Sequence, residues 1–292
     1  MFEISLEQKN YPTYLLKDVE NNSTVELVPE RGGIVTLWHY QDKEIFYLDT
    51  ERFQDPTKSV RGGIPILFPI CGNLVDDSYT YQGKKYNLKQ HGFARNLPWE
   101  VVEQDTDNQA SITLKLESND ETLAVYPFKF ELTFTYQLKG NALKIIQRHT
   151  NKSDVEMPFS TGFHPYFFVE DKSQLTFDIP ASQQVEKGSG KTYPFTGTFN
   201  FSQEEIDNTL FELTGNSASF TDNQRGITVT QNYSPEYTAL VFWTLQGKDF
   251  ICVEPWSAQR NSLNTGEDLI NLAPGETSET WNEIVACIER EE

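Results

Sequence analysis

The sequence predicts an all-β protein, a large antiparallel β-sandwich with few short helices. Apolar and polar residues alternate with a period of two along many short segments, which is typical of half-buried strands. Glycine, proline and asparagine pairs separate these segments. Long amphipathic helical patterns are missing from the 292 residues, and no linker or low-complexity run divides them. We therefore expect residues 1–292 to form one sandwich domain.

The clearest strand pair lies near the middle of the chain. Residues 130–138 alternate without a break, residues 139–142 are typical of a turn, and residues 143–150 form the expected returning strand of a hairpin. Residues 111–117 alternate in the same way. Later strands are expected at residues 175–179, 226–231, 237–244, 250–254 and 283–289. One short helical turn is predicted at residues 202–205, where a serine can cap it.

Composition excludes several classes of partner. The formal net charge of −19 and the pI near 4.6 argue against nucleic acid and against an anionic membrane. The N-terminal residues lack the basic and apolar regions of a secretory signal, and no apolar run is long enough to span a membrane, so a cytoplasmic location is expected. Cys71, Cys252 and Cys287 form neither a metal-ligand spacing nor a disulfide framework. We therefore expect no metal and no cofactor.

One histidine lies inside an otherwise aromatic run at residues 161–167. Histidine changes charge near neutral pH, so His164 can pass a proton to a substrate. Pro165 restricts its backbone towards an extended conformation. From its neighbours alone, His164 is either such a proton-transfer group or a core histidine bonded to a backbone carbonyl.

A second histidine occurs at residues 90–95. Gly92 permits a tight turn, so we expect the His91 ring to be exposed, either in a cleft or as an ordinary turn residue. Arg95 then reaches the rim of that cleft or forms a surface salt bridge. Two further histidines lie in strand-like patterns and are interpreted as structural or surface residues: His39 and His149.

Acidic candidates come from the second half of the chain. Glu254 lies at the end of an apolar strand that we expect Pro255 to terminate, and a charge there is costly unless it is paired or faces a cleft. Trp256 favours a cleft, because aromatic faces stack on the C–H surfaces of sugars. Asp207 is by itself more typical of a helix or turn cap.

Arg61 begins the glycine-containing segment at residues 61–69. We expect Gly62 and Gly63 to leave backbone N–H groups available, and the Arg61 guanidinium can bind an oxyanion or hydroxyls in a fork. The segment lacks the frame of a phosphate-binding loop. A surface salt bridge remains the alternative for Arg61, as it does for Arg95.

Five segments together carry a family resemblance. RGGIPILFP, QHGFARNLPWE, TGFHPYF, IDNTLF and CVEPWSA occur in the order seen in the aldose 1-epimerase (galactose mutarotase-like) family, and the resemblance covers about residues 25–285. RGGIP followed by QHGFAR is most similar to the glucose-6-phosphate 1-epimerase, or hexose-6-phosphate mutarotase, branch. The resemblance implies a β-supersandwich with an open sugar-binding cleft. It also implies site positions for His164, Glu254, His91 and Asp207, with Arg61 nearby.

The implied reaction interconverts the α and β anomers of an aldohexose or hexose 6-phosphate. Glu254 would remove the C1-hydroxyl proton and His164 would protonate the ring oxygen, with assistance from His91 and without a metal or nucleotide. The expected partner is a small-molecule sugar or sugar phosphate, and the oligomeric state stays open between a monomer and a weak dimer. Residues 70–73 differ from the aromatic stretch of many phosphosugar members, so the phosphate requirement also stays open.

Two other classes of function are compatible with part of the same pattern. A non-catalytic carbohydrate-binding or regulatory protein would need the aromatic residues and arginines, but not both His164 and Glu254. A glycoside-cleaving enzyme would normally need two carboxylates across the scissile bond. The motifs offer one carboxylate beside an aromatic residue, together with Asp207. This set of groups favours anomer exchange over hydrolysis.

Overall fold

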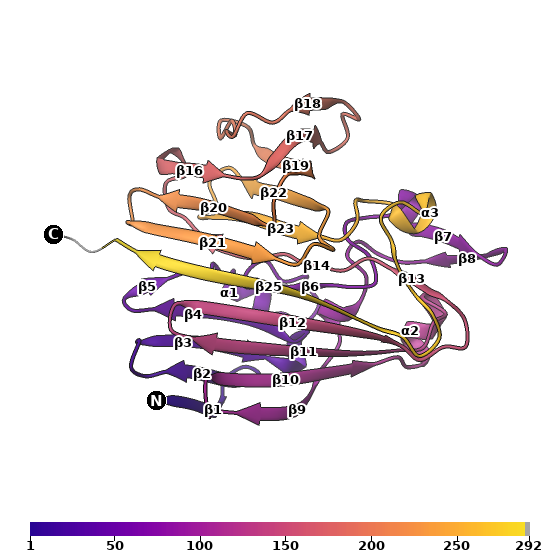
Figure 1. Cartoon of the computed structure of the whole chain (residues 1–292), viewed down its shortest axis with the longest axis horizontal. Helices are drawn as coiled ribbons and strands as arrows, with labels where there is room; N and C mark the ends of the chain where they lie inside the picture. Colours follow the sequence, from indigo (N-terminus) through magenta and orange to yellow (C-terminus); the bar gives the residue numbers. More distant parts are fainter. Residues whose placement is uncertain (290–292) are drawn as a thin grey trace.

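Antiparallel strands make up most of the protein. The computed structural model describes residues 1–289 and contains two eight-stranded sheets and one five-stranded sheet (Figure 1). The first eight-stranded sheet has the order β16 (Leu175–Asp178), β20 (Ser217–Asp222), β21 (Ile227–Tyr233), β25 (Thr277–Ile288), β12 (Ala142–Asn151), β11 (Phe130–Lys139), β10 (Ala110–Glu117) and β9 (Glu100–Asp105). The predicted all-β class with few helices is therefore confirmed.

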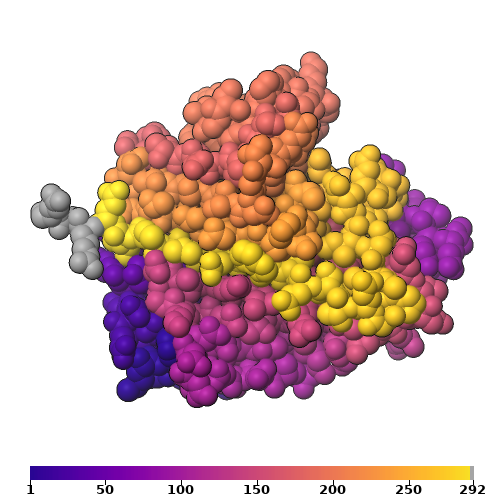
Figure 2. All heavy atoms as spheres, viewed as in Figure 1, coloured from indigo at the N-terminus to yellow at the C-terminus, as the bar shows by residue number. Residues whose placement is uncertain are grey.

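The second large sheet carries most of the residues discussed below. Its order is β18 (Thr192–Pro194), β17 (Ala181–Glu186), β19 (Glu205–Leu213), β22 (Ala239–Leu245), β23 (Phe250–Trp256), β14 (Gly162–Phe163) and β6 (Ile66–Leu67), and β15 (Tyr166–Phe168) also pairs with β23. The strands β17 and β18 belong to a segment that projects beyond the body of the molecule (Figure 2).

The five-stranded sheet follows sequence order at the N-terminus: β1 (Phe2–Gln8), β2 (Pro12–Asp18), β3 (Ser23–Val28), β4 (Ile34–Tyr40) and β5 (Lys43–Glu44). Two small pairs complete the described strands: β7 (Ser78–Tyr81) with β8 (Lys84–Asn87), and β13 (Met157–Phe159) with β24 (Ile270–Leu272). The α-helices are short: α1 (Thr50–Gln54), α2 (Asp120–Val125) and α3 (Ser262–Thr265). Within residues 1–289, no helix is long and apolar enough to cross a membrane.

Alternation along the strands builds the core. In β11 every second residue from Phe130 to Leu138 is buried, as the period-two pattern predicts. Lys139 pairs with Ala142 across a two-residue turn, so the predicted hairpin of β11 and β12 is confirmed. Inner faces of the large sheets contribute to one extended apolar cluster, which includes Phe134, Phe167 and Phe242.

The strand β23 is unusual because all seven of its residues are buried. Ile251 and Val253 on one face join the main core, whereas Glu254 and Trp256 on the other face line a cleft. The prediction that this strand ends at Glu254, before Pro255, is wrong by two residues, because β23 and its pairing with β22 continue to Trp256.

One predicted element is absent from the described residues. Residues 202–205 do not form a helical turn, and β19 already begins at Glu205. The backbone N–H and hydroxyl of Ser202 both bond to the side chain of Asn200. This local side-chain contact competes with the expected cap and favours a bend.

Candidate active site

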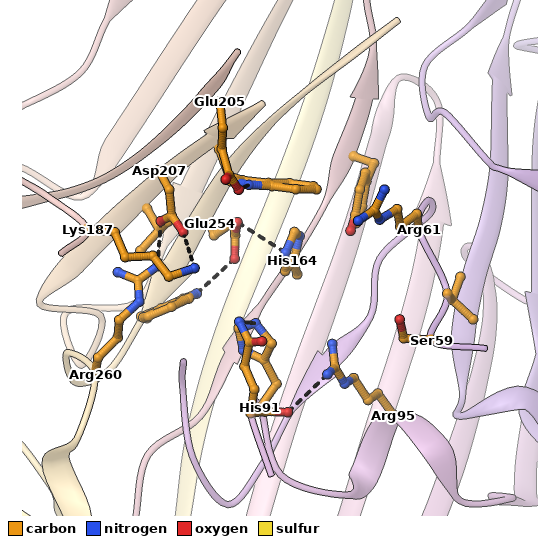
Figure 3. A pocket seen from close by; sticks show the side chains of 16 residues that line it. Ser59, Arg61, His91, Arg95, His164, Lys187, Glu205, Asp207, Glu254 and Arg260 are labelled. Carbon is orange, nitrogen blue, oxygen red and sulfur yellow. Dashed lines mark hydrogen bonds and ion pairs between the residues drawn. The ribbon is translucent and has the colours of Figure 1, made fainter. Parts of the chain in front are cut away.

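A polar cleft of about 230 Å³ opens above the second large sheet (Figure 3). The strands β19, β22 and β23 supply its floor and one wall, and segments around residues 59–61 and 90–95 supply the other side. All seven residues predicted as site residues line this cleft: Arg61, His91, Arg95, His164, Asp207, Glu254 and Trp256. Segments distant in the sequence therefore converge on one site.

His164 and Glu254 form a direct pair at the bottom of the cleft. The Nε2 atom of His164 lies 3.3 Å from Oε1 of Glu254. The Glu254 side chain is 1% exposed and that of His164 is 10% exposed, so the imidazole is the member that reaches towards the opening. His164 lies between β14 and β15 and directly precedes Pro165.

Neighbouring aromatic residues hold both members of this pair. The indole Nε1 of Trp256 donates a hydrogen bond to Oε2 of Glu254 at 3.1 Å. The Tyr166 ring stacks on the His164 ring with a centroid distance of 4.7 Å and an angle of 9°. The Nδ1 atom of His164 is buried and has no hydrogen-bond partner in residues 1–289, so contacts to its other nitrogen set which tautomer is present.

Burial changes the acid–base properties of the pair in opposite directions. It lowers the pKa of His164 to about 3, mainly because burial disfavours the imidazolium. It raises the pKa of Glu254 well above its usual range, again mainly through burial, with the charge of Asp207 contributing. These shifts favour a neutral imidazole beside a protonated carboxyl group. The pair still holds one proton, which is the number a reversible proton relay needs.

His91 is buried, with 4% of its surface exposed, so the expectation of an exposed ring is wrong. The reason is local. The backbone N–H of His91 bonds to the Gly72 carbonyl, and the N–H of Gly72 donates to Nδ1 of His91 at 3.1 Å. Burial, followed by the charge of Arg95, lowers the pKa of His91 well below its usual range. The ring is therefore neutral, and its proton lies on Nε2 because Nδ1 is an acceptor. The side-chain amide of Gln90 lies 3.2 Å from this Nε2.

Asp207 lies in β19 rather than in a cap, and its two oxygens are both engaged. Oδ1 accepts from Nη2 of Arg260 at 2.5 Å, and Oδ2 accepts from Nζ of Lys187 at 2.7 Å. Arg260 also donates to Thr209, and its guanidinium lies 4.9 Å from the centre of the Trp256 ring. On this side of the cleft two cations therefore share one carboxylate, so the network of Arg260, Lys187 and Asp207 keeps a formal charge of +1.

The opposite side of the cleft carries two arginines, Arg61 and Arg95 (Figure 3). Within residues 1–289, neither has a carboxylate within 4.0 Å. The surface salt bridge that was the alternative for both is therefore wrong. Arg61 lies 5.9 Å from the Trp243 ring centre, and Arg95 donates to the Gln90 carbonyl.

Of the two glycines that follow Arg61, Gly63 does not offer a free donor. The N–H of Gly63 bonds to the Tyr47 carbonyl at 2.8 Å, and Gly62 forms a bridge with Leu48. The expectation of available backbone N–H groups at Gly62 and Gly63 is therefore not met at Gly63. A β-carbon on Gly63 would lie 2.0 Å from the Val35 carbonyl oxygen, so close packing explains this glycine instead.

Several cleft residues escaped the sequence analysis: Lys187, Glu205, Trp243, Tyr166 and Arg260. Arg260 and Tyr166 lie just beyond predicted site residues, so their proximity in sequence was an available signal. Lys187 follows β17 in a stretch without any motif, and only the pairing of β17 with β19 brings it to Asp207. His39 is exposed, whereas His149 is fully buried in the core.

The sheets and this cleft define a galactose mutarotase-like protein. A galactose mutarotase-like protein from Clostridium acetobutylicum has the same fold, with a TM-score of 0.85 and 20% identity over 99% of both chains. The chain belongs to the aldose 1-epimerase family, whose model matches residues 13–284.

Two other proteins are similar over nearly the whole chain. The solved structure of the Slr1438 protein from Synechocystis sp. PCC 6803 has a TM-score of 0.94 and 46% identity, covering 99% of this chain and 100% of that one. Protein LacX from Lactococcus lactis is 27% identical, covering 91% of this chain and 92% of LacX. The similarity therefore extends well beyond the segments that line the cleft.

Proposed function

We propose that this protein is a mutarotase that interconverts the α and β anomers of an aldohexose by acid–base ring opening and closing. The observation that carries the proposal is the 3.3 Å approach of His164 Nε2 to Glu254 Oε1 in the cleft. Ring opening requires one group to take the C1-hydroxyl proton and another to protonate the ring oxygen. Family membership supports the same chemistry.

The proton count of the pair is consistent through the whole cycle. Opening starts from a carboxylate on Glu254 and an imidazolium on His164. Glu254 takes the hydroxyl proton, His164 protonates the ring oxygen, and the C1–O5 bond breaks to give the aldehyde. The pair then consists of a protonated Glu254 and a neutral His164. After rotation about C1–C2, the same transfers run backwards and close the other anomer.

The burial-induced shifts have a clear place in this cycle. A lowered pKa of His164 and a raised pKa of Glu254 stabilise the arrangement that accompanies the open-chain sugar. With ordinary pKa values, the protonated Glu254 and neutral His164 would be less favourable than the ion pair of a carboxylate and an imidazolium. The shifts therefore favour the proton transfers that open the ring over the return to the ion pair.

Neighbouring side chains have supporting roles in this proposal. The Nε2–H of neutral His91 donates to a sugar oxygen, and Trp256 orients the Glu254 carboxylate through its indole N–H. One ring face of Trp256 lies against Arg260, so we assign it to orientation of Glu254 more than to open stacking on a sugar. The Asp207 oxygens keep lone pairs that can accept sugar hydroxyls.

We further propose that the preferred substrate is anionic, a hexose 6-phosphate. Arg61 and Arg95 are the cationic groups on their side of the cleft, and neither is neutralised by a carboxylate within the described residues. The net charge of −19 repels an anion at long range, so a local pair of guanidiniums is needed to reverse the sign of the potential. Guanidinium forks match phosphate oxygens.

Anomer-exchange NMR tests the proposal directly. Adding the protein to glucose, galactose or glucose 6-phosphate should speed exchange between the α and β signals, most strongly for glucose 6-phosphate. A non-catalytic carbohydrate-binding protein would shift or broaden sugar signals without accelerating exchange. Unaltered exchange with all three sugars, measured on folded protein, would contradict the mutarotase assignment.

A further inference from the structure

Cys252 lies beside the His164–Glu254 pair and is not used in the proposed reaction. It is fully buried, next to Tyr166 and Phe250. Because side chains alternate along β23, Cys252 and Glu254 project from the same face of the strand. The sulfur of Cys252, a ring nitrogen of His164 and a carboxylate oxygen of Glu254 all lie within 4.8 Å of one another.

We infer that this cluster is an inhibitory site for a thiophilic divalent cation such as Zn²⁺. Cys252, His164 and Glu254 would supply one sulfur, one nitrogen and one oxygen ligand, and the cleft would supply the open fourth position for water. Three protein ligands and one open position are the usual arrangement of zinc sites that face a cleft.

The distances suit zinc after a small adjustment. Zinc–ligand bonds of about 2.0–2.3 Å in a tetrahedral site require ligand atoms roughly 3.3–3.8 Å apart. The His164–Glu254 separation is already 3.3 Å. The remaining separations are at most 4.8 Å, so the thiol must approach the other two ligands by about 1 Å.

The surroundings favour a soft cation over a hard one. A thiolate selects zinc and similar metals, whereas Mg²⁺ and Ca²⁺ prefer sites built from oxygen ligands. The hydrogen bond from Trp256 Nε1 already orients the Glu254 carboxylate, as outer hydrogen bonds do in metal sites. Arg260, which would repel a cation, is paired with Asp207.

Binding must release protons, because zinc takes a thiolate, a neutral imidazole and a carboxylate as ligands. The Cys252 thiol loses its proton to solvent as the sulfur–metal bond forms, and the proton shared by His164 and Glu254 leaves as well. The metal then occupies the two groups that exchange protons with the sugar. It therefore blocks turnover and competes with the sugar, and removing it restores the active form.

Co²⁺ provides a probe of the site that does not depend on activity. Protein treated with EDTA is titrated with Co²⁺, and the thiolate-to-cobalt charge-transfer absorption is recorded. Wild-type protein should develop this absorption, and Zn²⁺ but not Mg²⁺ should remove it. Cys252→Ala and Cys252→Ser should lose the absorption, and their affinity should fall by at least about tenfold.

Cys71→Ala is the matched control, because Cys71 is also a buried cysteine but lies outside the cluster. It should keep the absorption. The inference is overturned if wild-type protein shows no thiolate absorption, if a Cys252 variant keeps it, or if Cys71→Ala loses it. If a Cys252 variant does not fold, the cobalt absorption of wild-type protein and of Cys71→Ala still tests the inference.

Inhibition is measured separately, and this readout rests on the proposed function. Zinc should raise the apparent KM for the sugar in wild-type protein, and EDTA should restore the original value. Cys252→Ala should turn over sugar without zinc and resist inhibition by it. A cobalt spectrum in a protein without mutarotase activity would contradict the proposed function but leave the metal site standing. Zinc inhibition that is equal in wild type and Cys252→Ala would overturn the inhibitory role.

Discussion

His91 and Gly72 hold each other through two reciprocal hydrogen bonds. The His91 N–H donates to the Gly72 carbonyl at 2.7 Å, and the Gly72 N–H donates to Nδ1 of His91 at 3.1 Å. His91 adopts a φ of 65°, a left-handed conformation that is uncommon for a residue with a β-carbon. The two bonds stabilise that conformation and direct Nε2 of the ring away from Gly72 and towards the side-chain amide of Gln90, 3.2 Å away.

The acid–base pair gives the first prediction. His164→Asn and Glu254→Gln should each lower the rate of anomer exchange by about 10²- to 10⁴-fold, because each removes one of two required proton-transfer groups. Polarimetry with a freshly dissolved single anomer measures the loss. Circular dichroism and thermal unfolding should show that both variants are folded. Activity within a few-fold of wild type in either folded variant would refute the assignment.

The second prediction concerns the dependence of kcat/KM on pH. The active pair carries one proton, so activity should fall when the pair gains a second proton in acid or loses its only proton in base. Burial lowers the pKa of His164 to about 3, so the acidic fall should lie well below pH 6.5. The raised pKa of Glu254 contributes to the basic fall. An acidic limb centred near pH 6.5 would indicate an exposed, independent histidine instead.

The third prediction tests the anionic substrate. Arg61→Gln should raise KM for glucose 6-phosphate by about tenfold or more, because it removes a hydrogen bond to a charged group, and it should leave kcat for free glucose nearly unchanged. Arg95→Ala should act in the same direction, and added salt should weaken phosphosugar binding. Arg148→Gln is the matched control, since Arg148 is an exposed arginine paired with Glu279.

Arg61 is the cleaner probe of the two, because Arg95 also donates to the carbonyl of Gln90, next to His91. A general loss of activity in Arg95→Ala would therefore report on His91 as well as on phosphate binding. Equal kcat/KM for glucose and glucose 6-phosphate, with no differential effect of either substitution, would identify a general aldose mutarotase.

The fourth prediction concerns acid stability and His149. This residue is fully buried among Phe68, Phe134 and Phe159, and burial lowers its pKa to about 3 from 6.5. Below pH 6.5 the unfolded chain binds a proton that the folded chain excludes. The stabilising contribution is therefore complete above pH 6.5 and is lost as the pH falls towards 3.

Urea unfolding at several pH values measures this effect. His149→Gln should reduce the slope of unfolding free energy against pH by up to about 1.4 kcal/mol for each pH unit in this window. His39→Gln is a suitable control, because His39 is exposed. An unchanged slope in His149→Gln would show that His149 is protonated in the folded protein.

Much of the fold follows from local patterns in the sequence. Alternation along residues 130–138 is sufficient to predict β11, because a strand with one buried face must place every second side chain in the core. The turn at residues 140–141 follows from the freedom of Gly140 to adopt a positive φ, which is 58° here. The helical turn expected at residues 202–205 was wrong, because the Asn200 side chain competes for the Ser202 donors.

Residues that line the cleft could also be proposed from the sequence, since His164, Glu254 and His91 occur in motifs with chemically distinct neighbours. The protonation of these residues could not be predicted from the sequence, because it depends on burial by segments that are distant in the chain. Nothing near Gln90 in the sequence indicates that Gly72 will hold the His91 ring. Likewise, only the pairing of β17 with β19 brings Lys187 to Asp207, which Arg260 also contacts.

The sequence by itself determined the strand pattern, the resemblance to a family and the residue types available for proton transfer, since each of these depends on composition and short-range periodicity. Tertiary structure alone decided which cations remain unpaired, how His164 and Glu254 share a proton, and that Cys252 lies beside them. The physical reason is that electrostatic free energies depend on distance and burial, and both are set by contacts between strands far apart in the chain.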